Sequence, residues 1–297
     1  MGVLYGGNSS EREVSLESGA AVHRALINLG AHAELIDPGQ DGAIDMLTSK
    51  VDRAMIMMHG RGGEDGTIQG LLKTLGVPYS GSRVSACALA MDKWRSKLIF
   101  QGCGVPTPKF SVVQTVEELL TAIDNLGLPL IVKPSREGST IGITKVSRRQ
   151  DAKVAFDLAR RFDVTVIAEQ FIKGDELTVA VLNGEPLPVV RIVAPNNNYD
   201  YQAKYHSEET RYFCPSGLDS SVDRNIQDVA MKAFEALGCS GWGRVDVMLD
   251  QAAGAWVLEV NTVPGMTGHS LVPMAALEGG LTFEQLVLEI LRGCDVA

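Results

Sequence analysis

The stretch VLEVNTVPG, residues 257–265, has the apolar pattern of a strand that runs into a turn, yet it carries an acid and an amide. Glu259 and Asn261 lie two residues apart, and because the side chains of a strand alternate between its faces, both point to the same face. An unpaired carboxylate on an apolar strand costs several kcal/mol. The stretch therefore predicts a charged partner or a bound cation beside Glu259.

The preceding strand pattern, GRVDVML at residues 243–249, supplies such a partner. Its Arg244 and Asp246 are also two residues apart, and the short turn DQAAG makes this strand an antiparallel neighbour of the next one. We expect one surface to carry Arg244, Asp246, Glu259 and Asn261. Their oxygen ligands suit Mg²⁺, which commonly shares the phosphates of its substrate. An ion pair between Arg244 and either acid on a solvated sheet face explains the spacing equally well.

The composition is typical of a soluble globular protein of two or three domains, with 297 residues, 45% hydrophobic and 21% charged. A net charge of −9 argues against a nucleic-acid partner, because DNA-binding proteins usually carry a basic surplus. The five cysteines form no C-x-x-C pair, which is typical of reduced thiols in a cytoplasm. There is no apolar run long enough to span a bilayer and no apolar leader, so we expect a cytoplasmic protein without a membrane partner.

The order of strand and helix patterns predicts an α/β fold. Alternating patterns over residues 1–81 predict a parallel α/β unit. The stretch VSACALAMDKWRSKLIFQGCG is expected to be helical, and a domain boundary is expected near 82–92. Further along, Asn183–Gly184 is a strong turn signal between two strands. Residues 194–217 show no periodicity, and a loop of that length is usually functional or disordered.

Three glycine-rich loops follow strand patterns and offer further ligand sites. In VKPSREGSTIG, Lys133 ends a strand before a loop that is able to hold a phosphate; the loop lacks the Gly-Lys of a Walker A motif, and a plain hairpin turn explains it as well. In MHGRGGEDG, His59 lies where parallel sheets bind ligands, or is a satisfied histidine in a turn. YGGNSSERE offers Glu11, as a ligand-binding acid or an exposed helix cap.

A further candidate site combines two acids with an apolar pair. Glu169 and Glu176 flank Phe171 and Ile172, and acids beside an adenine-sized apolar patch often hold a ribose hydroxyl or an adenine amino group. A surface hairpin is the alternative. The chain contains no G-x-S-x-G, H-E-x-x-H or G-x-G-x-x-G, so a serine hydrolase, a zinc protease and a Rossmann enzyme are not supported.

These blocks occur in the order typical of the D-alanine–D-alanine ligases of the ATP-grasp superfamily, which the chain resembles from residue 1 to about 292. The matching blocks are GGNSSEREVSLESG, HGRGGEDGTIQG, MDKWRSK, VKPSREGSTIGI, AKYHSEET, GWGRVDVMLD and LEVNTVPGMTGHSLVPMAA. The resemblance implies an α/β (α+β overall) ATP-grasp fold, with an N-terminal parallel α/β substrate domain followed by two α+β domains that clamp ATP. The implied domains are 1–81, 82–170 and 171–297, the last with a mobile loop at about 194–217. The resemblance also implies a cytoplasmic homodimer.

The resemblance assigns a role to each candidate residue. The implied ligands of two Mg²⁺ ions, which Mn²⁺ is able to replace, are Asp246, Glu259 and Asn261. The implied ATP contacts are Lys93, Lys133, Glu169, Phe171, Ile172, Glu176 and Lys204. The implied catalytic residues are Glu11, Ser139, Tyr205, Arg244 and the backbone N–H of Gly265. The implied contacts of the two D-alanine substrates also include His59, Ser270 and Leu271.

The reaction implied by the resemblance joins two D-alanines through a D-alanyl phosphate, releases ADP and phosphate, and serves peptidoglycan precursor synthesis. The alternatives are a depsipeptide ligase that joins D-alanine to D-lactate, a ligase of another amino acid, and a non-catalytic nucleotide-binding protein. Tyr205 favours the dipeptide enzyme, because depsipeptide ligases tend to carry Phe or His there. The retained metal ligands and lysines argue against a non-catalytic protein. Val263 and Gly268 replace serines of the family block, and we expect small effects on the affinity for the second substrate.

Overall fold

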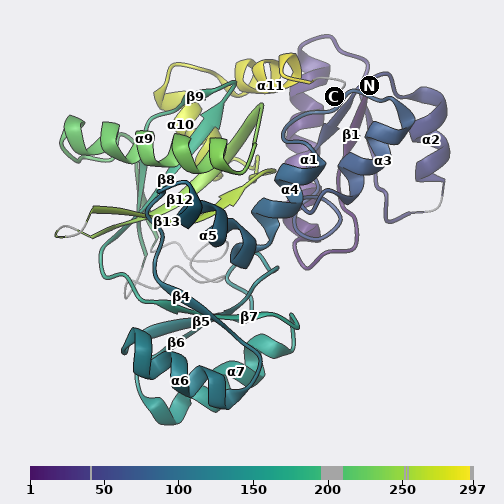
Figure 1. Ribbon diagram of the computed structural model, residues 1–297. Helices are drawn as coiled ribbons and strands as arrows, with labels where there is room; N and C mark the ends of the chain where they lie inside the picture. Colours follow the sequence, from purple (N-terminus) through teal and green to yellow (C-terminus); the bar gives the residue numbers. More distant parts are fainter. Residues whose placement is uncertain (41, 195–209, 251, 253, 295–297) are drawn as a thin grey trace.

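The computed structural model describes residues 1–40, 42–194, 210–250, 252 and 254–294, and this part of the chain contains three β-sheets (Figure 1). The first and third sheets lie beside each other with their helices, and the second sheet projects from them with its own pair of helices (Figure 1). One sheet is parallel and two are antiparallel. This mixture confirms the predicted α/β (α+β overall) fold class.

The first sheet is parallel and has the order β2-β1-β3. Its strands are β1 (Gly2–Leu4), β2 (Glu34–Ile36) and β3 (Ala54–Ile56), and the helices of this region are α1 (Arg12–Asn28), α2 (Ala43–Lys50) and α3 (Thr67–Leu75). Every residue of β1 and β3 is buried, as expected for parallel strands that are covered on both faces. The parallel sheet predicted for this part of the chain is confirmed.

The helical pattern that follows is confirmed, and it forms two helices, α4 (Val84–Met91) and α5 (Lys93–Gly102), with a break at Asp92. Asp92 leaves helical geometry with a ψ of 92°, and its Oδ1 accepts a hydrogen bond from the Arg95 N–H at 3.3 Å as the N-cap of α5. The Ser135 hydroxyl donates to the same oxygen at 2.7 Å. The break therefore places the first turn of α5 against the loop that follows β5.

The second sheet is antiparallel and has the order β4-β7-β5-β6. Its strands are β4 (Phe110–Val113), β5 (Leu130–Pro134), β6 (Thr144–Val146) and β7 (Val166–Gln170). The helices α6 (Val116–Leu126) and α7 (Ala152–Arg160) pack against it, with the short 3₁₀ helix η1 (Arg149–Asp151) between β6 and α7. The pairing of β5 with β6 confirms the hairpin predicted around the glycine-rich loop.

The third sheet has the order β11-β10-β8-β12-β13, and β9 pairs with β8 off this path. Its strands are β8 (Asp175–Leu182), β9 (Glu185–Pro186), β10 (Val190–Val193), β11 (Arg211–Phe213), β12 (Trp242–Asp250) and β13 (Gly254–Asn261). Asn183 and Gly184 have φ values of 51° and 87°, as the predicted turn requires. The strand β11 lies inside the stretch expected to be irregular, and three residues are too few to show a periodic pattern.

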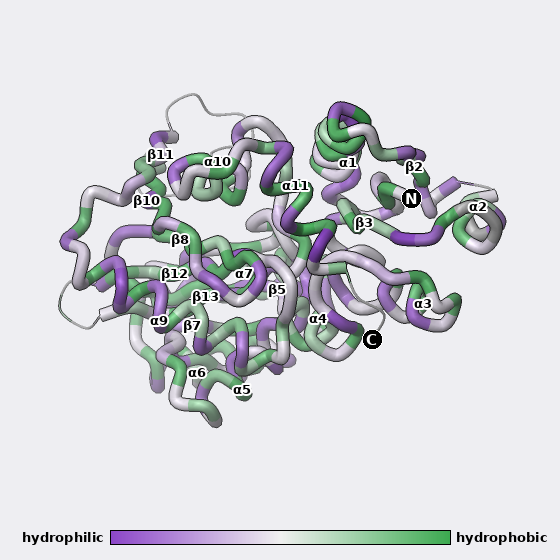
Figure 2. The backbone as a smooth tube through the Cα atoms, turned by 90° about the horizontal axis from the view of Figure 1, so that it is seen from above, coloured by the Kyte–Doolittle hydropathy of each residue, from purple (hydrophilic) through white to green (hydrophobic). Residues whose placement is uncertain are grey.

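The two faces of the third sheet belong to different cores. Along β8, Leu177, Val179 and Val181 face the core shared with α9 (Ser220–Ala236), whereas Ala180 and Leu182 face the core shared with the first sheet. The helices α10 (Leu271–Glu278) and α11 (Phe283–Arg292) also join that second core. Hydrophobic and hydrophilic segments are mixed along surface helices such as α3 and α9, as expected for amphipathic helices (Figure 2).

Two further features concern the helices. The sequence TFEQ at residues 282–285 has the pattern of a helix cap, and the structure confirms this prediction at the start of α11. The Thr282 hydroxyl accepts from the Gln285 N–H at 3.2 Å, and the Gln285 side chain accepts from the Thr282 N–H at 2.8 Å. Among the described residues, no single helix is long and apolar enough to cross a membrane, and α10 with α11 reaches that length only as a pair bent by 102°.

Candidate active site

The polar side chains of β12 and β13 form one surface, as the period of two in the sequence predicts. In the antiparallel register, Asp246 is paired with Glu259 and Arg244 with Asn261. The Arg244 guanidinium donates to the Asp246 carboxylate twice, from Nε to Oδ1 at 2.8 Å and from Nη2 to Oδ2 at 2.8 Å. Asn261 Nδ2 donates to Oδ2 at 3.0 Å, and the Thr178 hydroxyl of β8 donates to Oδ1 at 2.7 Å. The shared face and the ion pair are therefore both present.

The oxygen atoms of this surface fit a Mg²⁺ ion that shares its coordination with a substrate. Asp246 and Glu259 supply carboxylates and Asn261 an amide oxygen, which are the hard ligands that Mg²⁺ prefers. Two carboxylates in directly opposed positions repel each other, so a cation between them is favoured. Within the part of the chain that the structure describes, no group of three or more His, Cys, Asp or Glu is arranged to hold a metal ion. Water and nucleotide phosphates would complete the coordination.

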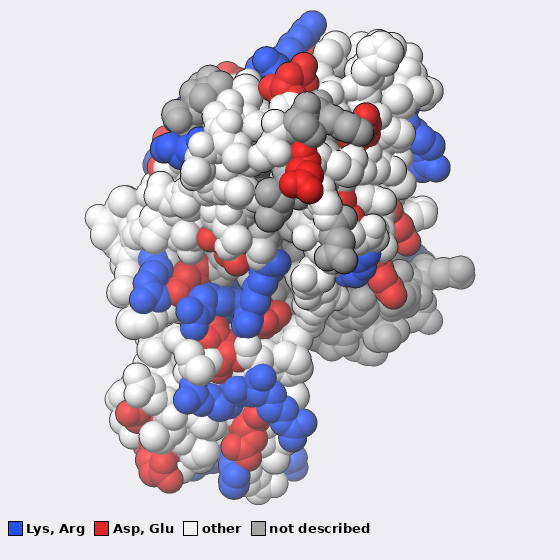
Figure 3. Space-filling view, turned by 90° about the vertical axis from the view of Figure 1, so that its right-hand side faces the viewer, with Lys and Arg blue, Asp and Glu red and all other residues white. Residues whose placement is uncertain are grey.

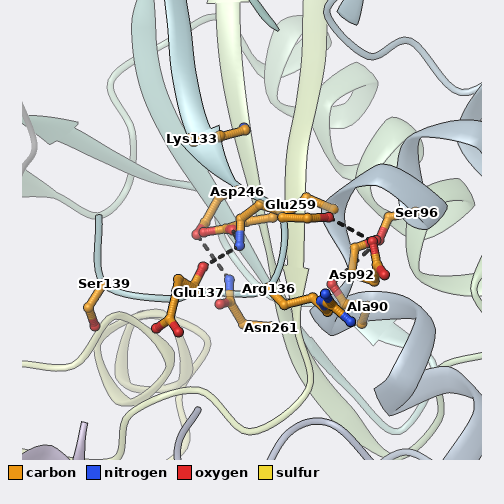
Figure 4. A network of polar contacts seen from close by, with 12 residues as sticks. Ala90, Asp92, Ser96, Lys133, Arg136, Glu137, Ser139, Asp246, Glu259 and Asn261 are labelled. Atoms are coloured by element: carbon orange, nitrogen blue, oxygen red, sulfur yellow. Dashed lines mark hydrogen bonds and ion pairs between the residues drawn. The ribbon is translucent and has the colours of Figure 1, made fainter. Parts of the chain in front are cut away.

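Lys93 lies on the other side of the Glu259 carboxylate. Its Nζ is 2.9 Å from Glu259 Oε2 and donates to the backbone carbonyl oxygen of Glu137 at 2.6 Å. Burial opposes the charge of this lysine, but Glu259 outweighs it and raises the pKa of the Lys93 ammonium. Figure 4 shows Asp246 and Glu259 side by side on their strands, with Glu137 on the neighbouring loop. The lysine thus places positive charge beside the candidate metal ligands.

Lys133 and Glu169, two of the predicted ATP contacts, form an ion pair. Lys133 Nζ donates to Glu169 Oε1 at 3.0 Å, and Lys97 is in ion-pair contact with Oε2 of the same carboxylate. Burial opposes the charge of Glu169, but the two lysines hold the pKa of its carboxyl below the ordinary value. The sequence analysis missed Lys97, although it lies one helical turn after Lys93 on the same face of α5. The contact of Glu169 with adenine or ribose stays a prediction.

The structure brings Glu11 and Ser139 together from different parts of the chain. The Ser139 hydroxyl donates to Glu11 Oε1. Ser139 and Thr140 have φ values of 49° and 64°, a conformation that is uncommon for residues other than glycine and is often held at ligand sites. A Cβ at residue 138 would lie 2.5 Å from Glu11 Oε2, so any larger residue there would displace the Glu11 carboxylate. Tyr205 and Lys204, which the resemblance adds to the site, lie outside the described residues.

A cavity of about 170 Å³ lies over the polar surface of β12 and β13. Its lining includes these predicted site residues: Glu11, His59, Ser139, Arg244, Glu259, Asn261, Gly265, Ser270 and Leu271. It also includes Glu17, Glu64 and Tyr212, which the sequence analysis did not single out. The structure therefore gathers the predicted catalytic and substrate residues that it describes around one cavity.

His59 is buried, and its two ring nitrogens have partners of opposite kind. Nδ1 lies 2.7 Å from the carbonyl oxygen of Val263, which can only accept, so Nδ1 carries the proton. Nε2 lies 3.2 Å from the Ser18 hydroxyl, which in turn accepts from the Met266 N–H at 3.0 Å. Burial lowers the pKa of His59, with Glu11 opposing the shift. A neutral imidazole therefore holds the chain segment that contains Gly265.

Glu64 is an acid of the cavity that the sequence analysis missed. Its Oε2 accepts from the Gly60 N–H at 2.7 Å and its Oε1 from the Val263 N–H at 3.2 Å. Burial raises the pKa of the Glu64 carboxyl to about 8, and the nearby Glu11 carboxylate adds to the shift. Its position at the end of a glycine-rich loop after β3 was the available signal. Its partner at residue 263 lies too far along the chain to be read from the local pattern.

The segment between β13 and α10 carries the remaining predicted substrate contacts. Ser270 is the N-cap residue of α10, and its Oγ accepts from the Thr267 N–H at 2.9 Å. Gly265 lies so close that a Cβ would be 2.9 Å from Ser270 Oγ. Val263, where the family block often has serine, is buried in the core of the first sheet and donates its N–H to the site. Gly268 is exposed, and a Cβ there would meet nothing within 4 Å.

The predicted adenine-binding residues lie at the connection between β7 and β8, outside the lining of the cavity. The Lys145 ammonium is 3.6 Å from the centroid of the Phe171 ring, and Ile172 is buried. A Cβ on Gly174 would lie 1.9 Å from the Leu249 carbonyl oxygen, so this connection is packed directly against the end of β12. The contacts of Phe171, Ile172 and Glu176 with a nucleotide stay predictions.

Charged pairs join the loops around the site. Arg61 binds the Glu137 carboxylate at 2.7 Å and donates to the Phe162 carbonyl oxygen at 2.7 Å, which links the loop after β3 to the second sheet. Arg136 donates to both carboxylate oxygens of Asp163, at 3.0 and 2.7 Å. Acidic and basic side chains are correspondingly intermixed on the face shown in Figure 3. These contacts hold the loop that carries Ser139.

Comparisons with known proteins agree with this geometry. Two family models match the chain, one described as D-ala D-ala ligase N-terminus over residues 31–82 and one as D-ala D-ala ligase C-terminus over residues 99–292. The D-alanine–D-alanine ligase of Bordetella pertussis (strain Tohama I) is 53% identical over 295 residues, covering 98% of this chain and 93% of that protein. The crystal structure of D-alanine–D-alanine ligase from Bacillus anthracis has a TM-score of 0.88 at 33% identity and covers 98% of this chain and 96% of that chain. Its complex with ATP gives 0.87 at 31% identity, with the same shares of 98% and 96%.

Proposed function

The chain belongs to the D-alanine–D-alanine ligase family, and we propose from the geometry of its site how its residues carry out the reaction of that family. It is an ADP-forming ligase that joins two D-alanines for peptidoglycan synthesis and uses ATP. One observation carries the residue roles: Asp246 and Glu259 occupy opposed positions between Arg244 and Lys93, and Arg244 and Glu259 line the cavity. Nothing in the described part of the chain favours D-lactate as the second substrate.

The first D-alanine binds beside Glu11 and Ser139, which are hydrogen-bonded to each other and both line the cavity. The Glu11 carboxylate is suited to the substrate ammonium. The substrate carboxylate then attacks the γ-phosphate of ATP, which gives D-alanyl phosphate and ADP. Lys93 and Lys133 offset the charge of the phosphate oxygens, so the protein acts mainly by positioning and electrostatics.

The amine of the second D-alanine then attacks the acyl carbon, and phosphate leaves. Arg244 and the backbone N–H of Gly265 both line the cavity and are suited to the tetrahedral oxyanion. Ser270 and Leu271, at the start of α10, hold the carboxylate end of the second substrate. His59 contributes to this step indirectly: its hydrogen bonds hold the segment that contains Gly265 in place.

Metal ions would complete the site. When bound by Asp246, Glu259 and Asn261, two Mg²⁺ ions, or Mn²⁺ in their place, would supply positive charge to the phosphate oxygens of ATP. We also propose a homodimer that acts in the cytoplasm with D-alanine and ATP as its small-molecule partners. Both of these proposals rest on membership of the family.

The assay that tests the proposed roles is phosphate release from ATP in the presence of Mg²⁺ and D-alanine. We expect turnover with D-alanine and background release with L-alanine or D-lactate alone. The Arg244→Ala variant is the matched inactive control, because it removes one oxyanion donor. Absence of D-alanine-dependent turnover in the unaltered protein would contradict the proposed function.

A further inference from the structure

Two buried lysines share one carboxylate beside the candidate nucleotide site. Lys97 is 0% exposed, Glu169 3% and Lys133 5%. They come from three elements, α5, β7 and β5, and Glu169 is in ion-pair contact with Lys97 through Oε2 and with Lys133 through Oε1 at 3.0 Å. Among the described residues, Glu169 is the only acid in ion-pair contact with these two lysines. Both of its carboxylate oxygens are thus occupied.

This arrangement carries more positive than negative charge. A structural ion pair needs one lysine for one carboxylate, and a second buried ammonium without its own counter-ion is costly. Burial lowers the pKa of the Lys97 ammonium to about 8, whereas the charges of Glu169 and Glu259 favour the ammonium. Glu259 already binds Lys93 at 2.9 Å. The surplus charge is therefore explained by an anionic ligand that approaches one of the two lysines of Glu169.

The two lysines differ in what else they contact. Lys97 Nζ also donates to the Thr107 hydroxyl at 2.6 Å, and that hydroxyl donates to the Val257 carbonyl oxygen at 2.9 Å. Lys97 is therefore held between Glu169 and the edge strand β13. Lys133 lies in β5, shortly before the loop that carries Ser139, and Figure 4 shows it above the carboxylates of the β12–β13 surface. Lys133 is the lysine in position for a ligand.

We propose that Lys97 is a positioning residue for the nucleotide, which neutralises Glu169 from its sealed side and so leaves the charge of Lys133 for the polyphosphate of ATP. This inference rests on the proposed nucleotide contact of Lys133. It assigns Lys97 no contact with the nucleotide. Without Lys97, Glu169 and Lys133 would form a neutral pair, and the site would lose one unit of positive charge.

The test is the Lys97→Met variant, which keeps the approximate length of the side chain and removes its charge. We expect the Kd of ADP, measured by calorimetry without D-alanine, to rise roughly tenfold, as the loss of one charge at this range implies. The KM for ATP should rise in parallel while the KM for D-alanine stays within about twofold. Lys153→Met is the matched control, because Lys153 pairs with Asp157 on the exposed face of α7.

A second variant separates this role from a structural one. In Lys97→Arg the positive charge beside Glu169 is retained, so the Kd of ADP should stay within about threefold of the unaltered protein. An unchanged Kd in Lys97→Met, a lower melting temperature as its sole effect, or a Lys97→Arg variant as weak as Lys97→Met would each overturn the inference. Should Lys97→Met not fold, Lys97→Gln, which also lacks the charge, takes its place, and an unchanged Kd there overturns the inference. Loss of D-alanine-dependent turnover in the unaltered protein concerns the proposed function instead.

Discussion

Asp246 and Glu259 occupy directly opposed positions of β12 and β13, so two carboxylates share one face of the sheet. Like charges in such a pair are destabilising, and here Arg244 and Lys93 bind one carboxylate each. The two cations explain how a strand that looks unsuited to a core is accommodated in the fold. The effect of each acid on stability therefore depends on its cation partner, whereas its effect on catalysis depends on the ligand it binds.

The first prediction concerns Glu259→Gln. The substitution removes one of two opposed negative charges, but it also leaves the buried Lys93 ammonium without its carboxylate, so we expect a lower melting temperature without ligands. The Mg²⁺-dependent turnover should fall at least about 100-fold, since a charged ligand of the metal is lost. Glu185→Gln, at an exposed position of β9 in the same sheet, is the control. Full activity of Glu259→Gln with Mg²⁺ would refute the ligand role.

The second prediction concerns the two parallel hydrogen bonds from the Arg244 guanidinium to Asp246. Arg244→Lys keeps a positive charge but cannot donate to Asp246 from two parallel N–H groups, as Arg244 does at 2.8 and 2.8 Å. We expect kcat to fall by about 10²–10³, the usual effect of removing an oxyanion donor. The KM for ATP should change little. Steady-state kinetics with ATP and D-alanine varied separately measure the split, and a change confined to KM would contradict the oxyanion role.

The third prediction concerns Gly265→Ala. A Cβ at this position would lie 2.9 Å from Ser270 Oγ, so the segment or the cap of α10 has to shift. We expect the KM for the second D-alanine to rise and kcat to fall, with binding of ADP unchanged. Gly268→Ala is the matched control on the same segment, where a Cβ meets nothing within 4 Å. Equal kinetics of the two variants would argue against a close approach at residue 265.

Several features of this site follow from the sequence, because they depend on short-range geometry. The period of two predicts that Arg244, Asp246, Glu259 and Asn261 share a face, and the short turn between their strands predicts the antiparallel pairing. The turn at Asn183–Gly184 and the cap of α11 depend on equally local chemistry. These predictions are confirmed by the strand register, the positive φ values and the capping hydrogen bonds.

Other features depend on contacts between distant segments and could not be read from local patterns. Asp92 interrupts a helical pattern where Ser135, 43 residues later in the chain, binds its carboxylate. Glu64 is half-buried, and the N–H of residue 263, far along the chain, donates to its carboxylate. Lys97 has the appearance of an ordinary helix lysine until Glu169 is placed opposite it. In each case the tertiary fold supplies the partner that makes the residue functional.

The fourth prediction concerns the acid side of the stability profile and His59. Burial lowers the pKa of His59 in the folded protein, so the unfolded chain binds a proton more readily. Its contribution is therefore present above the ordinary pKa of about 6.5 and is lost as the pH falls below that value. His59→Asn keeps a donor near Val263 but has no group that titrates. Its melting temperature should be lower at pH 7.5 and fall less between pH 7 and 5. His23→Asn is the control, and parallel profiles would contradict the assignment.

The fifth prediction concerns the alkaline side and Glu64. Burial raises the pKa of this carboxyl to about 8, so the folded protein holds its proton more tightly than the unfolded chain does. The stabilisation is complete below the ordinary pKa of about 4.3 and is lost as the pH rises toward 8.

Glu64→Gln cannot ionise, and its amide nitrogen cannot accept from the Gly60 or Val263 N–H, so it should be less stable than the unaltered protein at pH 6. The difference in melting temperature should shrink by pH 9, because only the unaltered protein then carries a buried charge. Glu17→Gln, at an exposed acid of the same cavity, is the control. A constant difference for Glu64→Gln would show that Glu64 is ionised across the whole range.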